Sequence, residues 1–263
     1  MICSYCENDS IYHRKYSGEN LCFDCFNKSI EQQIYRTISK FKMLEPQDKI
    51  ILGLSGGKDS MVLLFNLIKI QQKIPNSPSI IAITINEGIL GYREKNIRKS
   101  KEYCKKNNIE HKIISFKEKL GKSMDEILEI YKKNYLEPYP CNICATIRRR
   151  LLNDVGKNLG GTVLALGHNL DDVSQTFLMN LLRKDFYKIS RMNPFLEENN
   201  EIYLKKIKPL MKIPEKEIIL YAQNKELDFV NNPCPYKLKY PILRKRVQLF
   251  LNNCEEYSPE IKF

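Results

Sequence analysis

The chain has 263 residues, 43% of them hydrophobic, and 43 Lys and Arg residues against 31 Asp and Glu residues give a net charge of +12. No apolar run approaches the length of a membrane-spanning helix and the N-terminus opens with cysteines rather than a signal peptide, so we expect a soluble, cytoplasmic protein of one large domain plus a small appendage. The positive charge favours a polyanionic partner, although a generally Lys-rich composition would produce it too.

Two Cys-x-x-Cys pairs lie in residues 1–28, and their spacing is typical of a zinc site with four thiolate ligands. The four cysteines are Cys3, Cys6, Cys22 and Cys25. A segment this short has too little core to fold alone, so we expect Zn²⁺ to supply its folding energy. Disulfides or free thiols are the alternative, which a chain without a secretory signal disfavours. His13 is expected at the surface, because the thiolates already complete the ligand set.

Apolar residues at spacings of three and four within 29–48 predict an amphipathic helix with Ser29 as its N-cap. This helix would link the finger to a main domain at 49–230. Residues 231–263 would form a basic C-terminal segment.

A glycine turn separates a predicted strand at 49–54 from a predicted helix at 61–68. Its sequence is Ser55-Gly56-Gly57-Lys58-Asp59-Ser60. This arrangement binds phosphate, because glycines let the backbone approach an anion and the helix N-terminus offers free N–H groups. Lys58 adds a positive charge and the two serines add donors. Asp59 would repel phosphate, unless it orients the loop or helps to hold Mg²⁺.

The order of residues in this turn differs from that of the Walker loop, in which the lysine follows a longer spacing of glycines. The hexapeptide resembles the PP-loop of the ATP pyrophosphatases. In that family the loop holds the β,γ-pyrophosphate of ATP while the α-phosphate is attacked, which yields an adenylated substrate and free pyrophosphate. An ordinary glycine-rich turn is the alternative interpretation.

Three further apolar segments, 79–85, 111–116 and 162–166, are predicted to be strands, with helices near 94–107 and 123–135 between them. Strands that alternate with helices predict an α/β domain with a parallel sheet. In such a sheet, ligands bind beyond the carboxyl ends of the strands.

Two polar turns follow predicted strands and are therefore expected to contact a nucleotide. One begins at Asn86, and the other is Gly167-His168-Asn169-Leu170-Asp171-Asp172. The paired carboxylates of Asp171 and Asp172 can hold Mg²⁺ or act on a bound substrate. Helix capping by Asp171 is the structural alternative.

A third Cys-x-x-Cys pair, Cys141 and Cys144, is followed by arginines at 148–150. We expect the second cysteine to open a helix, so that the helix N-terminus and the arginines favour thiolates; two inert buried cysteines are the alternative. Cys234 lies between two prolines that would hold it rigidly. Three cysteines can bind a [4Fe–4S] cluster and leave one iron open.

Basic residues accumulate after Leu204, and aromatic residues alternate with them near the C-terminus. They include Lys237, Lys239, Arg244, Lys245 and Arg246, with Tyr236 and Tyr240 among them. Such a mixture suits a surface that contacts a nucleic-acid backbone and stacks on bases.

Six motifs in this order resemble the TtcA/TtuA family of tRNA thiolation enzymes. They are the double Cys-x-x-Cys of residues 1–28 and the segments 55–60, 88–93, 141–144, 167–172 and 232–236. The TtuA-like branch fits best because it carries the N-terminal zinc finger. The resemblance implies an α/β fold: a parallel-sheet PP-loop ATP pyrophosphatase domain, adenine nucleotide alpha hydrolase-like, preceded by that small finger.

The resemblance implies an ATP-dependent tRNA 2-thiouridine synthetase. ATP would adenylate the C2 oxygen of a uridine, and sulfur would then attack C2 while AMP leaves. Asp59 and Asp172 match positions that the family places near the reacting groups. The residues expected to bind ATP and Mg²⁺ are Ser55, Gly56, Gly57, Lys58, Asp59, Ser60, Asn86, Gly167, His168 and Asp171.

Cys141, Cys144 and Cys234 would ligate a [4Fe–4S] cluster whose open iron takes sulfide and presents it to the base. The expected partners are tRNA, modified at uridine 34 or 54, a second copy of the chain, and a sulfur donor, either sulfide or a ubiquitin-like carrier protein. One alternative keeps the adenylation but uses a persulfide on Cys141 or Cys144, resolved by Cys234. The other is a zinc-dependent tRNA-binding partner subunit without catalysis.

Three features depart from the family pattern. Arg148 stands where the branch commonly has lysine, so the charge is kept but an acid–base role is in doubt. Asn86 replaces a frequent aspartate, which weakens a carboxylate contact to the nucleotide or Mg²⁺. The branch usually has a C-terminal zinc finger, which we expect this chain to lack because Cys254 stands alone near Phe263.

Overall fold

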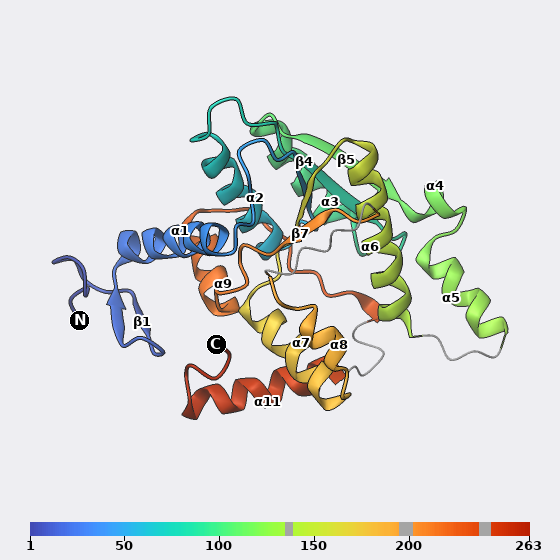
Figure 1. Ribbon diagram of the computed structural model, residues 1–263. Helices are drawn as coiled ribbons and strands as arrows, with labels where there is room; N and C mark the ends of the chain where they lie inside the picture. The colour runs from blue at the N-terminus through green and yellow to red at the C-terminus, as the bar shows by residue number, and fades with distance from the viewer. Residues whose placement is uncertain (135–138, 195–201, 237–242) are drawn as a thin grey trace.

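A five-stranded sheet forms the centre of the computed structural model, which describes residues 1–134, 139–194, 202–236 and 243–263 (Figure 1). The strand order is β5-β4-β3-β6-β7, and every neighbouring pair is parallel. The strands are β3 (Ile50–Gly53), β4 (Ile81–Asn86), β5 (Glu110–Ser115), β6 (Val163–Ala165) and β7 (Lys205–Ile207). The parallel α/β architecture expected from the sequence is confirmed.

Helices cover both faces of the sheet, as apolar residues on both sides of a parallel sheet require. Leu52 and Ala82 face a core shared with α1, α2 and α9, whereas Ile51 and Ile83 face a core shared with α5 and α6. The described helices are α1 (Phe23–Lys40), α2 (Lys58–Gln71), α3 (Glu94–Lys106), α4 (Phe116–Leu120), α5 (Met124–Lys133), α6 (Pro140–Asn158), α7 (Leu170–Leu182), α8 (Phe186–Ser190), α9 (Glu215–Asn224) and α11 (Leu243–Tyr257).

Strand β7 has no counterpart among the predicted strands, because its sequence Lys205-Lys206-Ile207 contains only one apolar residue. As an edge strand it buries Ile207 while Lys206 reaches solvent. Its extended form follows from pairing with β6, where Ala165 lies opposite Ile207. Part of the basic stretch after Leu204 is therefore sheet structure.

The N-terminal finger is an antiparallel hairpin of β1 (Tyr12–Arg14) and β2 (Glu19–Leu21), followed directly by α1. Cys22 is the N-cap of this helix, and its sulfur accepts the Cys25 N–H. The predicted helix start at Ser29 is therefore wrong, because Ser29 lies inside α1. The finger and the linking helix overlap instead of meeting at residue 28.

The finger packs against the main domain and shares its core. Leu21 is fully buried in the same cluster as residues of α2 and α9. Arg14 donates from Nε and Nη2 to the two carboxylate oxygens of Glu217 in α9, at 3.0 and 3.1 Å, and both residues are buried. This two-pronged pair fixes the orientation of the finger on α9.

The polar turns expected to bind ligand meet at one edge of the sheet. Strands β3 and β6 are neighbours although β4 and β5 lie between them in sequence, so the direction of winding reverses here. Parallel sheets bind ligands at such a switch point, beyond the carboxyl ends of the strands. The turns after β3 and β6 are therefore adjacent.

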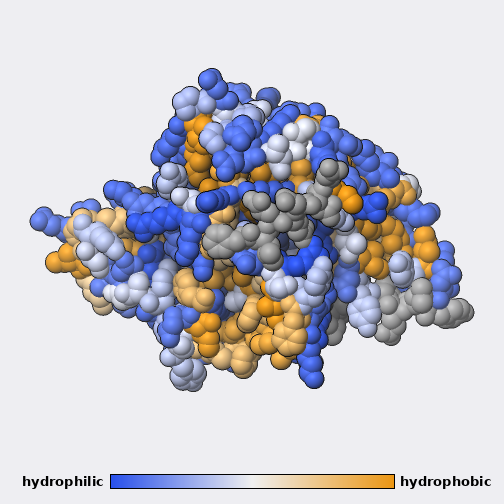
Figure 2. Space-filling model, viewed as in Figure 1, coloured by the Kyte–Doolittle hydropathy of each residue, from blue (hydrophilic) through white to orange (hydrophobic). Residues whose placement is uncertain are grey.

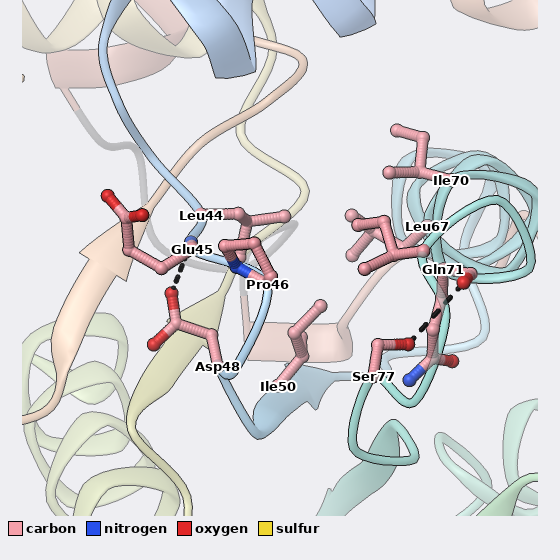
Figure 3. Close-up of a pocket in the computed structure, with 10 residues that line it drawn as sticks. Leu44, Glu45, Pro46, Asp48, Ile50, Leu67, Ile70, Gln71 and Ser77 are labelled. Carbon is pink, nitrogen blue, oxygen red and sulfur yellow. Dashed lines mark hydrogen bonds between the residues drawn. The ribbon is translucent and has the colours of Figure 1, made fainter.

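A small cavity lies at the opposite edge, where β3 begins. Figure 3 shows Pro46 and Ile50 on one side of it and Leu67 and Ile70 of α2 on the other. Its volume of about 20 Å³ admits no more than a water molecule. A substrate site must therefore be sought at the carboxyl edge.

Apolar side chains gather on the surface over α7 and α8 (Figure 2). The exposed large apolar residues of these helices are Phe177, Leu181, Leu182, Phe186 and Tyr187. No helix in the described part of the chain has the length and apolar character needed to cross a membrane.

Candidate active site

Gly56 shapes the turn after β3, because its φ of +74° lies in the left-handed region that favours glycine. A Cβ on Gly56 would lie 2.8 Å from the Asn96 carbonyl oxygen and 2.9 Å from the Ser100 hydroxyl. The loop thus packs directly on α3. Arg93 and Asn96 donate to the Ser55 carbonyl at 3.1 and 3.2 Å and hold the turn in place.

Helix α2 begins beside this turn with Gly57 as its N-cap, and no side chain caps it. Its first backbone N–H groups and the positive end of its dipole therefore face the turn and attract an anion. The Ser55 and Ser60 hydroxyl oxygens lie 3.0 Å apart at the same place. The arrangement has the donors of a phosphate cradle.

The charged residues of the loop, Lys58 and Asp59, are held by partners. Lys58 Nζ lies 3.0 Å from an Asp59 oxygen and 2.6 Å from Glu215 at the start of α9. Burial opposes the charge of Lys58, but the two carboxylates outweigh it and raise its pKa. Asn169 donates to the other Asp59 oxygen at 2.9 Å. Asp59 therefore orients the loop.

The turn after β6 starts α7 through Asn169. The Asn169 side chain accepts the Asp172 N–H at 2.9 Å, and the Asp172 side chain accepts the Asn169 N–H at 3.4 Å, which forms a capping box. A Cβ on Gly167 would lie 3.0 Å from the Ser60 nitrogen. This turn therefore packs on the backbone of the first loop.

Asp171 does not cap α7, so the capping role considered for it is wrong. Its two oxygens accept from the Lys262 ammonium at 2.6 Å and from the Glu215 N–H at 2.7 Å. Asp171 is buried and positions Glu215, the partner of Lys58. Its contact with the nucleotide stays a prediction.

Asp172 is the carboxylate that remains open to the site. Arg244 donates to it at 3.1 Å and to the Thr176 hydroxyl at 2.9 Å. Burial raises the pKa of Asp172, and the charge of Arg244 opposes this effect. A carboxylate in such a position can hold Mg²⁺ or accept a proton.

His168 lies between several cations of the site. The residue is exposed at the surface, yet the protein atoms around it partly desolvate the imidazole, and this effect together with the charges of Lys208 and Arg244 lowers its pKa to about 4. The imidazole is therefore neutral at pH 7 and offers one N–H donor without a charge.

We expect the His168→Asn variant to lose part of the acid sensitivity of the wild-type protein. The pKa of a histidine in the unfolded chain is about 6.5, whereas the pKa of His168 in the folded protein is about 4. Between these two pH values the unfolded chain binds more protons than the folded protein. The free energy of unfolding of the wild-type protein therefore has its full value above a pH of about 6.5 and decreases as the pH falls toward 4.

The measurement is the free energy of unfolding in urea at a series of pH values. As the pH falls through this window, the free energy of unfolding should decrease more for wild type than for His168→Asn. His13→Asn serves as the control, because His13 bonds to Asn20 on the exposed finger surface. Parallel pH profiles for wild type and His168→Asn would contradict the prediction.

A cavity of about 290 Å³ brings together the three cysteines expected to act together. Cys141 and Cys144 come from α6, and Cys234 comes from the segment before α11. A water molecule takes about 30 Å³ of liquid volume, so the cavity can hold a group of several atoms. The other lining residues are Glu87, Ile89, Tyr92, Met124, Pro140, Ala145, Arg148 and Tyr236.

The segment that carries Cys234 is fixed at both ends. The Val230 N–H donates to the Gly56 carbonyl at 3.0 Å, which ties its start to the phosphate loop. The Tyr236 hydroxyl donates to Asp125 of α5 at 2.6 Å, which ties its end to the far side of the cavity. The same short segment therefore contacts both parts of the site.

Two expectations about Cys144 are wrong. Helix α6 begins at Pro140, so Cys144 lies a full turn inside it rather than at its N-terminus. Burial raises the pKa of the Cys144 thiol to about 11, although Arg148 opposes this. Arg149 and Arg150 are exposed and do not line the cavity. Metal coordination, which deprotonates a thiol outright, would have to favour the thiolate instead.

Glu87 is a fully buried carboxylate that connects the cavity with the phosphate loop. Arg93 donates to both of its oxygens at 2.7 Å, and Arg148 lies 3.4 Å away. Burial alone would raise the Glu87 pKa, but these hydrogen bonds and charges lower it. Arg93 also donates to the Ser55 carbonyl. The cysteine cavity and the phosphate loop are therefore connected through Arg93.

The finger cysteines form a second, tighter group. Their four sulfur atoms lie within 4.8 Å of one another, and within the described ranges this is the one group of three or more ligand atoms so closely gathered. Cys6 Sγ lies 3.6 Å from Cys22 Sγ and 3.7 Å from Cys25 Sγ. This spacing suits one tetrahedral ion, whereas the cavity cysteines surround a larger volume.

The structure shows local contacts for Asn86 and for one of the basic C-terminal residues, and their predicted binding roles stay predictions. The Asn86 side chain accepts the Gly88 N–H at 3.0 Å and so shapes the turn after β4; a nucleotide contact stays a prediction. Arg244 faces the site through its contact with Asp172. Three further members of the predicted nucleic-acid surface lie outside the described residues: Lys237, Lys239 and Tyr240.

Sequence reasoning missed the site roles of Glu87, Glu215 and Lys208. Glu87 stands in a polar turn after a predicted strand, which is a signal for a ligand-side residue but not for a buried ion pair. Glu215 follows Pro214 at the start of an unpredicted helix. Lys208 follows β7, whose sequence gives no strand signal.

The sequence is similar to a known protein family and to several named proteins. A family model described as PP-loop domain matches residues 27–253. A protein of Methanocaldococcus jannaschii named probable sulfurtransferase is 38% identical over 268 residues, which cover 100% of this chain and 75% of that protein. Cytoplasmic tRNA 2-thiolation protein 1 of Xenopus laevis is 33% identical, over 98% of this chain and 74% of the relative.

Solved structures agree with these relatives. The U34-tRNA thiolase NcsA from Methanococcus maripaludis, determined with its [4Fe-4S] cluster, superposes with a TM-score of 0.87 at 39% identity, over 100% of this chain and 83% of that chain. The NMN synthetase of Francisella tularensis superposes with a TM-score of 0.53 at 13% identity, which shows a shared fold alone. The family expected from the six motifs is confirmed.

Proposed function

This chain belongs to the PP-loop domain family, and we propose that within it the protein is an ATP-dependent tRNA-uridine 2-sulfurtransferase. One observation carries the proposal: a cavity lined by three cysteines is joined to a phosphate cradle through Glu87 and Arg93. Adenylation and sulfur delivery need these two parts side by side. The names of the relatives support the same chemistry.

In the first step, the C2 oxygen of a uridine attacks the α-phosphorus of ATP and pyrophosphate leaves. The N-terminus of α2 and the two loop serines would hold the pyrophosphate portion. Lys58 would turn from Glu215 toward the phosphates as they bind, because phosphate offers it a stronger negative charge. Asp59 and Asp172, which both bond to Asn169, are the carboxylates that would hold Mg²⁺.

In the second step, sulfur attacks C2 of the adenylated base and AMP leaves. Cys141, Cys144 and Cys234 fit a [4Fe–4S] cluster, because they line a cavity wide enough for one and are the soft ligands it takes. When bound, such a cluster supplies an open iron that can carry the sulfur. Arg148 lines the same cavity and would stabilise negative charge on the base or the phosphate without exchanging a proton.

The finger is proposed to hold one Zn²⁺ in a structural role. Four thiolates with no open position are typical of structural zinc. The buried contact between Arg14 and Glu217 places the finger on α9, whose first residue is the partner of Lys58. We propose that the finger keeps α9 in place beneath the site.

Uridine 34 is the proposed position of modification, because the thiolase from Methanococcus maripaludis is named for it. The proposed location is the cytoplasm, supported by the name of the Xenopus laevis relative. A homodimer stays a proposal, supported by the exposed apolar side chains of α7 and α8. The sulfur donor is proposed to be sulfide or a ubiquitin-like carrier protein.

The test is a thiolation assay with protein purified without oxygen, unmodified tRNA, Mg-ATP and sulfide. We expect 2-thiouridine and pyrophosphate in equal amounts, with neither formed when ATP is omitted. No pyrophosphate from a protein that binds tRNA would favour the non-catalytic partner subunit. Thiolation by protein that holds zinc but no iron, when a persulfide donor replaces sulfide, would favour a persulfide on the same cysteines.

A further inference from the structure

The cations at the carboxyl edge differ in how they are paired. Lys58 contacts two carboxylates, and Arg244 contacts Asp172. Lys208 is half-buried, yet its ammonium has no hydrogen bond or ion pair within the part of the chain that the structure describes. Lys208 thus differs from Lys58 and Arg244, because no described residue pairs with its ammonium.

The backbone holds Lys208 firmly in this position. Ile207, the last residue of β7, pairs with Ala165 of β6, and its carbonyl accepts the Leu166 N–H at 3.0 Å. Pro209 follows and restricts Lys208 to an extended conformation. Lys208 therefore lies one residue beyond the sheet, next to the turn that carries His168.

The surroundings of the ammonium group favour an anion. Burial lowers the pKa of Lys208, the charge of Lys206 adds to this effect, and Asp172 opposes it without forming an ion pair. A half-buried charge without a partner costs stability, and a bound anion would remove that cost.

We propose that Lys208 binds a phosphate group of the substrates during the reaction. The inference rests on the proposed function, which supplies two sources of phosphate: the nucleotide and the tRNA backbone. The turn with His168 packs on the phosphate loop through Gly167, so the nucleotide can reach Lys208. A flexible lysine suits this role, because its compact ammonium group acts as a point charge toward phosphate.

The experiment compares Lys208→Met, Lys208→Arg and the control Lys212→Met in separate binding arms. In the first arm, calorimetry measures the affinity for Mg-ATP and for inorganic pyrophosphate without tRNA. In the second arm, filter binding measures tRNA affinity without ATP over a series of salt concentrations. Lys212 is a half-buried lysine of the same stretch, and its carbonyl accepts from the Gln33 side chain of α1.

We expect Lys208→Met to weaken binding in at least one arm by about 10-fold or more, as for a lost charge-assisted hydrogen bond. A loss confined to the first arm identifies the nucleotide. A loss confined to the second arm, with the salt slope reduced by about one, identifies a tRNA phosphate. Lys208→Arg should keep most of the affinity, and Lys212→Met should keep all of it.

A second measurement separates binding from folding. Because Lys208→Met removes an unpaired half-buried charge, its melting temperature without ligands should equal or exceed that of wild type. A lower melting temperature, or unchanged affinity in both arms, would overturn the proposal. If wild type itself binds neither ATP nor tRNA, the proposed function fails; if wild type binds both and Lys208→Met binds them equally well, only the role of Lys208 fails.

Discussion

Replacing Cys234 by alanine is expected to remove the bound iron and abolish thiolation of tRNA while the chain stays folded. Cys234 supplies the third thiol of the cavity, beside the pair on α6 that lines the same space. Loss of an outer-shell partner alone typically costs about 10–100-fold in metal affinity or activity, so loss of a direct ligand should exceed that range. The side chain is small and only half-buried, so alanine leaves little empty volume.

The measurement is iron and zinc content, with an absorption spectrum, on protein purified without oxygen. Cys254→Ala is the matched control, because Cys254 is a half-buried cysteine of α11 that does not line the cavity. The control should keep its iron and its activity, and both variants should keep zinc in the finger. Wild-type iron content in Cys234→Ala would refute the three-cysteine site.

Gly56→Ala is expected to destabilise the protein and to inactivate the phosphate loop. Alanine at a φ of +74° is strained, and its Cβ would lie 2.8 Å from the Asn96 carbonyl oxygen, which is fixed in α3. The left-handed conformation costs about 1–2 kcal/mol, and the forced shift of packed atoms costs about 1–3 kcal/mol more. The total is a large share of a typical stability of about 5–15 kcal/mol.

The neighbouring glycine provides the control for this prediction. Gly57 has φ of −85°, and a Cβ there would meet the Ser55 hydroxyl at 3.5 Å, which is an ordinary van der Waals contact. Urea unfolding without nucleotide should therefore find Gly57→Ala close to wild type and Gly56→Ala clearly weaker. Equal stabilities for the two variants would show that the loop relaxes away from α3. Activity of Gly56→Ala should fall by roughly 100-fold, because a displacement of about 1 Å can misalign a reacting phosphate that much.

The sequence predicted the parts of the fold that rest on local pattern. Buried strands such as Ile81–Asn86 are nearly continuous apolar runs, which the sequence shows directly. The helix that follows Ser123 begins with a capping box, which is also a local sequence pattern. Strand β7 was not, because its extended form comes from pairing with β6 rather than from its own residues. The start of α1 was misplaced because a cysteine, an unusual cap, occupies the N-cap.

The site divides in the same way. The cysteines and the glycine loop could be predicted because their chemistry depends on residue type and spacing. The ion pairs that hold these residues could not be predicted, because their members are far apart in the sequence and meet only in the folded chain. The pairs are Glu87 with Arg148 and Lys58 with Glu215. Burial also reversed one prediction: the Cys144 thiol is less acidic than its neighbouring arginines suggest, because desolvation outweighs their charge.

The distribution of the cysteines along the chain sets an order for the assembly of the two proposed metal sites. The finger cysteines all precede residue 26, so they can capture an ion while most of the chain is still being synthesised on the ribosome. Cys234 is separated from Cys144 by β6, α7, α8, β7 and α9. The three-thiol cavity therefore forms only after nearly the whole sheet has formed, and the proposed cluster would be inserted there late, after the finger has bound its proposed ion.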